Sequence, residues 1–169
     1  MAEPAFERLL QHMGWANQRM FATLLELPPE TLSLSAWNPD WRVGVIANHI
    51  VVAAGRLASR INDEPPAIGG PAPTTAQDLA LLARLAETND RALLGLAATP
   101  DEVRRFDRAG QPMEFQVSTI LAQAVHHAAE HRAQIADILA ANDLDVMDLD
   151  AMDLWSFELW HRSRLSESN

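Results

Sequence analysis

The spacing of apolar residues constrains the fold of this chain more than any other feature. In four separate stretches, residues 5–27, 45–61, 79–96 and 118–142, apolar side chains recur at three- and four-residue steps. This spacing places them on one face of a helix, which must then be buried against other helices. Four such stripes in a chain of 169 residues predict an all-α fold, a four-helix bundle in a single domain spanning residues 1–169.

The segments between the stripes predict how the helices connect. Pro28 and Pro29 end the first helix, and Thr75 or Asp78 can cap the start of the third. Between the second and third stripes lies NDEPPAIGGPAPTT, residues 62–75, whose four prolines and two adjacent glycines predict the longest irregular connection. A long crossover between helices 2 and 3 permits these two helices to lie parallel.

Two smaller elements are expected beyond the four helices. Residues 103–118, VRRFDRAGQPMEFQVS, contain a glycine-centred turn between two short apolar stretches, which is compatible with a small hairpin. Residues 147–165 carry Trp155 and Trp160 and predict a short C-terminal helix.

Composition and charge exclude several kinds of function. The chain has no cysteine, so disulfides, thiolate metal sites and cysteine nucleophiles are excluded, and any reacting thiol must come from outside. The formal net charge of −10 repels nucleic acid and an anionic membrane surface, so neither is expected as a partner. The N-terminus lacks a signal-peptide pattern and no run of 18 apolar residues occurs, which favours a soluble cytoplasmic protein.

The stretch HHAAEHRAQI, residues 126–135, holds three histidines, of which only two share a helix face. His127 and His131 lie four residues apart and point the same way, which lets two imidazoles reach one metal ion. His126 points about 100° away, where it can pair with Glu130. A metal site usually takes a third protein ligand, and in a bundle this ligand comes from a facing helix. His49, in the middle of the second apolar stripe, completes a three-histidine set.

Other polar and aromatic residues have an ordinary structural interpretation beside the functional one. His12 and His161 lie near expected helix ends and are interpreted as solvated, and Glu130 as a surface residue rather than a partner that orients an imidazole. Gln134 lies one turn beyond His131 and could contact a ligand or pack against a neighbouring helix. Trp41 is assigned to the core, although a tryptophan at a helix entrance can also wall a pocket.

These residues resemble the DinB/YfiT-like superfamily, which places one histidine in the second helix and a His-x-x-x-His pair in the fourth. HRAQI is similar to the family's frequent His-Arg-Gly-Gln-Ile, with Ala133 in place of glycine, and GWANQRM is similar to its Trp-Ala-Asn pattern. The resemblance covers nearly the whole chain. It implies a four-helix bundle, often a homodimer, with a divalent metal on His49, His127 and His131. Some members are similar to transferases or isomerases that use a low-molecular-weight thiol.

The resemblance and the residues together leave three functions open. The first is a metal-dependent transferase, with zinc or nickel, that joins a low-molecular-weight thiol to a small electrophile. The second is a hydrolase in which the metal activates water, although the sequence offers no convincing base. The third is a metal- or ligand-binding stress protein without turnover.

Overall fold

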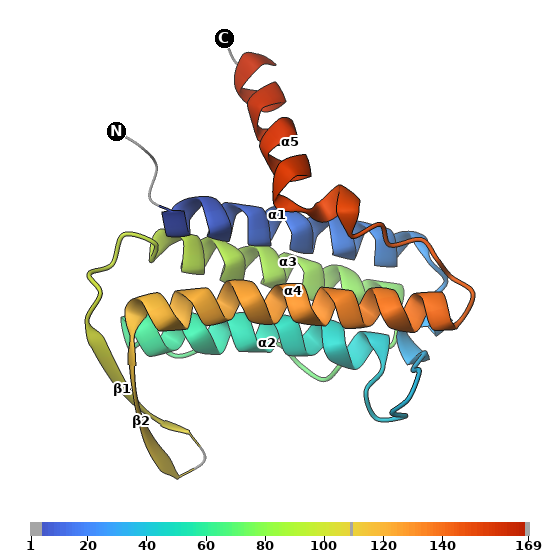
Figure 1. Ribbon diagram of the computed structural model, residues 1–169. Helices are drawn as coiled ribbons and strands as arrows, with labels where there is room; N and C mark the ends of the chain where they lie inside the picture. Colours follow the sequence, from blue (N-terminus) through green and yellow to red (C-terminus); the bar gives the residue numbers. More distant parts are fainter. Residues whose placement is uncertain (1–4, 109, 168–169) are drawn as a thin grey trace.

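The computed structural model describes residues 5–108 and 110–167, and it is a four-helix bundle with a small hairpin and a fifth helix (Figure 1). The all-α prediction is confirmed. The bundle helices are α1 (Ala5–Glu26), α2 (Val43–Asn62), α3 (Ala76–Gly95) and α4 (Val117–Ala141).

The bundle has the parallel pair that the long crossover permits. In Figure 1, α2 and α3 run in one direction and α1 and α4 in the other, so the chain between α2 and α3 returns along the bundle. Helix α1 packs against α3 and α4, and α2 packs against the same two helices. The antiparallel pair α2 and α4 carries the histidines of interest.

Polar contacts at the helix ends and along the crossover explain why the elements form where they do. The Thr75 side chain accepts a hydrogen bond from the Asp78 backbone amide, and the Asp78 carboxylate accepts one from the Thr75 amide, which caps α3 as expected. The crossover packs on Gly55 so closely that a Cβ there would lie 2.4 Å from the carbonyl oxygen of Ala67. Asn89 of α3 donates hydrogen bonds to that oxygen and to Val51 of α2, at 3.0 and 2.9 Å. These bonds fix the crossover against both helices.

A buried polar network ties α1, α3 and α4 together inside the apolar core. Asn17 donates to Asp90 Oδ2 at 3.0 Å and accepts from Arg132 Nη1 at 2.6 Å. Burial raises the pKa of Asp90 to about 6 and lowers the pKa of Arg132 to about 10, because water no longer stabilises either charge. This network was not anticipated from the sequence.

The hairpin consists of antiparallel strands β1 (Val103–Arg108) and β2 (Gln111–Gln116), which confirms the glycine-centred turn. Gly110 adopts a φ of 82°, a conformation that glycine adopts without steric penalty. The strands extend from the end of the bundle where α2 finishes and α4 begins (Figure 1), with β1 against α2 and β2 against α4.

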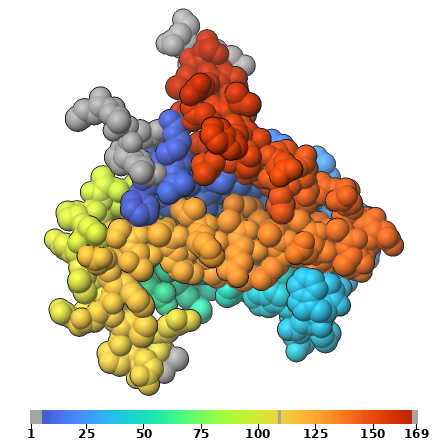
Figure 2. Space-filling model, viewed as in Figure 1, coloured from blue at the N-terminus to red at the C-terminus, as the bar shows by residue number. Residues whose placement is uncertain are grey.

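Helix α5 (Leu154–Glu167) follows a short 3₁₀ helix (Asp150–Met152) and stands away from the bundle (Figures 1 and 2). The base of this tail covers His12, whose Nε2 donates to the Met152 carbonyl at 2.8 Å and whose ring lies 5.8 Å from that of Phe157. The interpretation of His12 as a solvated residue was therefore wrong. It lies within α1, and the C-terminal tail returns to bury it.

None of the helices in the described part of the chain combines the length and apolar character needed to cross a membrane.

Candidate metal centre

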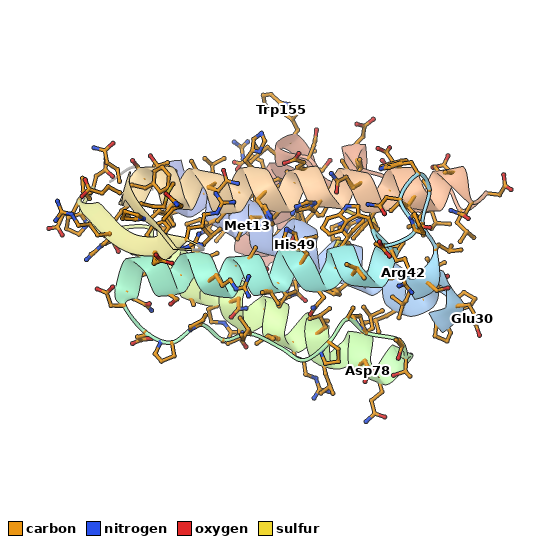
Figure 3. The ribbon with its side chains drawn as sticks, turned by 90° about the horizontal axis from the view of Figure 1, so that it is seen from below. Met13, Glu30, Arg42, His49, Asp78 and Trp155 are labelled. Atoms are coloured by element: carbon orange, nitrogen blue, oxygen red, sulfur yellow. The ribbon has the colours of Figure 1, made fainter. Side chains whose placement is uncertain are left out.

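The structure brings His49, His127 and His131 together across the α2–α4 pair. His49 Nε2 lies 3.0 Å from His127 Nε2, which in turn lies 3.1 Å from His131 Nε2. One ligand atom from each histidine lies within 4.8 Å of the other two. Figure 3 shows His49 on the side of α2 that faces α4. Residues 78 positions apart in the sequence therefore present nitrogens to one point.

The position of His49 within its helix differs from the prediction. The sequence placed it in the middle of the inward stripe, but its side chain is exposed, whereas His127 is half-buried and His131 is buried. Ile46 and Ile50 take the buried positions of this part of α2, and His49 lies at the edge of their stripe with the half-buried Val45 and Ala53. The site is therefore open to solvent on the His49 side.

Gln134 fixes the orientation of the buried histidine. Its Oε1 accepts a hydrogen bond from His131 Nδ1 at 2.8 Å and another from Trp41 Nε1 at 2.9 Å. A proton held on Nδ1 leaves the lone pair of His131 on Nε2, the nitrogen that faces the other two histidines. Of the two roles considered for Gln134, the structure supports contact with a candidate ligand.

Trp41 packs against the histidines as well as against the core. Its ring lies edge-on to His49 and to His131, with centroid distances of 5.3 and 5.6 Å. It also packs on the hydrophobic core, as predicted, so it joins the core to the site. Trp37, by contrast, is 65% exposed. The sequence did not indicate that Trp41 and Gln134 act as one unit, because 93 residues separate them.

Electrostatics favour the neutral imidazole at His49 and His127. Burial, followed by charge repulsion from His131, His49 and His126, lowers the pKa of His127 to about 4. Burial, followed by His131 and Arg56, also lowers the pKa of His49. A neutral imidazole has a free lone pair, which is the form that binds a metal ion.

The geometry around His127 fits a metal better than a hydrogen-bonded cluster. One ring nitrogen offers in its plane either one N–H or one lone pair, so His127 Nε2 cannot make two ordinary hydrogen bonds at once. His127 Nε2 makes two short contacts, of 3.0 and 3.1 Å, so a hydrogen bond accounts for only one of them. A zinc ion with Zn–N bonds of about 2.0–2.1 Å at tetrahedral angles holds nitrogens about 3.3 Å apart. The donor set and these two separations therefore fit a shared divalent ion.

The remaining histidines lie outside this cluster. His126 Nδ1 lies 3.9 Å from Glu130 Oε2, and both side chains are exposed, which confirms the predicted surface pair. Glu130 is thus directed to His126 rather than to a candidate ligand. His161 is half-buried on α5, with its ring 5.6 Å from that of Phe157.

Comparison with known proteins agrees with the fold. The DinB family model matches residues 1–140, which include α1 to α3, the hairpin and all of α4 except Ala141. Among solved structures, the chain is similar to a DinB-like protein from Bacillus cereus, with 26% sequence identity and a TM-score of 0.64, over 85% of this chain and 94% of that one. No protein in the comparison with curated sequences matches. The part matched by the family model ends before α5.

Proposed function

We propose, since this chain belongs to the DinB family, that His49, His127 and His131 bind one divalent metal ion and that the protein transfers a low-molecular-weight thiol to a small electrophile. The observation that carries the proposal is the convergence of three imidazoles at a site that is open on one side, two of which, His49 and His127, have lowered pKa values. Three protein ligands leave a coordination position for a reactant.

The proposed metal is zinc or nickel. Three imidazole nitrogens accept several divalent ions, so the ion bound in the cell depends on metal supply as well as on geometry. When bound, such an ion would act as a Lewis acid and lower the pKa of a coordinating thiol.

The residues of the chain have distinct tasks in this proposal. Gln134 holds His131 with its Nε2 toward the site, and Trp41 packs edge-on against the rings of His49 and His131. The exposed edge of His49 is the side from which the thiol and the electrophile would approach. The thiol must come from a separate molecule because the chain has no cysteine. The thiol sulfur would form a bond to the electrophilic carbon while the bond from that carbon to its leaving group breaks, and the leaving group and the thiol proton would both pass to solvent through the open side.

Metal-dependent hydrolysis of a substrate is the less favoured function because it needs a base beside the metal. Glu130 is the acid closest to the histidine pair in sequence, and it faces His126 instead. No carboxylate joins the histidine group in the described part of the chain. Turnover of esters or amides without added thiol would favour the hydrolase.

The direct test is thiol transfer by protein loaded with zinc or nickel. Bacillithiol, mycothiol and glutathione are each incubated with a panel of electrophiles, and products are identified by mass spectrometry. Transfer is expected with the wild type and with His126→Ala, and its loss with His127→Ala. No transfer with any thiol, or equal transfer by His127→Ala, would argue against the proposal.

We also propose that the protein is a homodimer, as the family resemblance implies. Helix α5 carries large exposed apolar side chains, with Trp155 81% and Leu159 71% exposed, and a second chain could cover them. Light scattering after size exclusion measures the mass directly, and a monomer at micromolar concentration would contradict this.

A further inference from the structure

The stripe of α2 that carries His49 continues as a line of arginines. His49, Ala53, Arg56 and Arg60 are spaced by four, three and four residues, so they lie on one face of the helix. Arg56 lies seven residues beyond His49, about 10 Å along the axis at about 1.5 Å per residue. Ala53 is the small residue between them. The exposed side of the histidine cluster therefore leads directly to two cationic side chains.

The hairpin brings a third arginine to the same place. Side chains alternate along a strand, so Phe106 and Arg108 share one face of β1, the strand that packs against α2. The Arg60 guanidinium lies 4.4 Å from the centroid of the Phe106 ring, which places Arg108 beside the end of the arginine line. Burial, followed by repulsion from Arg108 and then Arg56, lowers the pKa of Arg60, as expected for three cations that face one another.

Unlike several other arginines, these three have no ion pair with a carboxylate among the described residues. Arg91 pairs with Glu87, and Arg105 with Glu114, at 2.5 and 2.6 Å. Within residues 5–108 and 110–167, no carboxylate forms an ion pair with Arg56, Arg60 or Arg108. The chain has 23 acidic residues against 13 arginines and lysines, so acids are not scarce.

A single arginine without an ion pair in the described part of the chain, such as the exposed Arg84, is ordinary on a protein surface. Three arginines in one place differ from a single surface arginine, because like charges four residues apart on a helix, such as Arg56 and Arg60, destabilise it. The Phe106 ring and the end of α2 offset part of the repulsion at Arg60. Neither reaches the exposed Arg56, two turns from His49. A bound anion that accepts hydrogen bonds from several of these guanidinium groups would offset the repulsion between them.

We propose that Arg56, Arg60 and Arg108 form a binding site for the carboxylate or phosphate group of the small molecule that reacts at the three histidines. The inference rests on the proposed function for the identity of that reaction, but the anion site itself does not depend on metal or turnover. Guanidinium groups bind both kinds of oxyanion through paired N–H donors. The anionic group would lie near Arg56, with the reactive end of the molecule toward His49.

The first test uses metal-free full-length protein and isothermal titration with inorganic phosphate, succinate and the uncharged succinamide. The wild type is expected to bind one or both anions and not succinamide. The double variant Arg56→Gln/Arg60→Gln is expected to bind the anion at least about tenfold more weakly, since each lost guanidinium removes charge-assisted hydrogen bonds. Arg84→Gln, which removes the same charge from α3, is the matched control and should bind as the wild type does.

Equal anion affinity in the double variant and the wild type would overturn the proposal, as would an equal loss in Arg84→Gln, which would show an effect of net charge alone. Absence of any phosphate or succinate binding to the wild type would also overturn it. Circular dichroism checks folding, and Arg56→Lys keeps the charge without the paired donors. An intermediate affinity is expected for this variant.

A second measurement separates this proposal from the proposed transferase. With metal-loaded protein, the KM for an electrophile that carries a carboxylate should rise about tenfold or more in the double variant, while the KM for its amide analogue stays unchanged. Thiol transfer without any preference for the carboxylate would refute the anion site alone. Anion binding that depends on the arginines, without thiol transfer, would refute the transferase alone.

Discussion

Replacing Gln134 with leucine tests whether Gln134 orients His131 for metal binding. The change removes one oxygen that accepts hydrogen bonds from both His131 Nδ1, at 2.8 Å, and Trp41 Nε1, at 2.9 Å. Leucine has a similar size, so the packing between α2 and α4 changes little. His131 is then free to rotate or to carry its proton on Nε2, where the proton competes with a metal.

The expected magnitudes follow from these two bonds. A buried donor left without a partner costs about 1–3 kcal/mol. Both bonds are only part-buried, so the free energy of unfolding of the metal-free protein should fall by about 2 kcal/mol in total. Loss of a partner that orients a ligand typically weakens metal affinity 10- to 100-fold, which corresponds to about 1.4–2.7 kcal/mol.

Urea unfolding in chelator measures the first effect, and competition with a chromophoric chelator measures the second. Gln134→Glu keeps the acceptor oxygen and strengthens the bond to His131, so its metal affinity should equal or exceed that of the wild type. Gln123→Leu makes the same change at an exposed position of α4 and is the control. If Gln134→Leu matched Gln123→Leu in both assays, the orienting role of Gln134 would be refuted.

Two further predictions concern stability. Gly55→Ala should destabilise the protein by about 1–3 kcal/mol because its Cβ would lie 2.4 Å from the Ala67 carbonyl oxygen. Gly95→Ala, whose Cβ would meet nothing within 4 Å, should be neutral or stabilising by up to about 1 kcal/mol. Thermal melts in which the two variants behave alike would contradict this prediction. Burial lowers the pKa of His12. Below about pH 6.5 this histidine is therefore protonated in the unfolded chain but stays neutral in the folded protein. The stability that neutral His12 contributes to the folded state is lost as the pH falls toward the lowered pKa. His12→Gln, which keeps a donor for the Met152 carbonyl, should lose less stability between pH 7.5 and 5 in urea unfolding, and an unchanged pH dependence would count against the buried neutral histidine.

The sequence predicted the elements of the fold because those elements are local. Apolar spacing marked the four helices, the proline-rich segment marked the crossover, and the Thr75 cap lies where it was expected. The same reasoning selected His49, His127 and His131, since a four-residue step and a facing helix are enough to bring them together. Whether they bind a metal stays a prediction.

The exposure of individual side chains, and contacts between residues far apart in the sequence, could not be predicted from local spacing. An apolar helical stripe has edges, and the sequence does not say which neighbouring element covers each edge. His49 was therefore predicted to be buried although it is exposed, and His12 was predicted to be solvated although it is buried. The bond between Trp41 and Gln134 depends on how α2 and α4 are aligned along their axes, which periodicity does not fix. A usable signal existed for the buried network, because Asn17 is a polar residue on an otherwise apolar inward stripe of α1.

The metal content of the protein and its histidine variants tests the central claim most directly. Wild type, His49→Ala, His127→Ala, His131→Ala and His126→Ala are loaded with zinc or nickel, dialysed together against trace metal, and analysed by inductively coupled plasma mass spectrometry. We predict about one ion per chain for the wild type and for His126→Ala, and loss of most bound metal in the other three, because three imidazoles share the ion. Retention of a full ion by His49→Ala, or equal losses in all four variants, would contradict a metal centre that bridges α2 and α4.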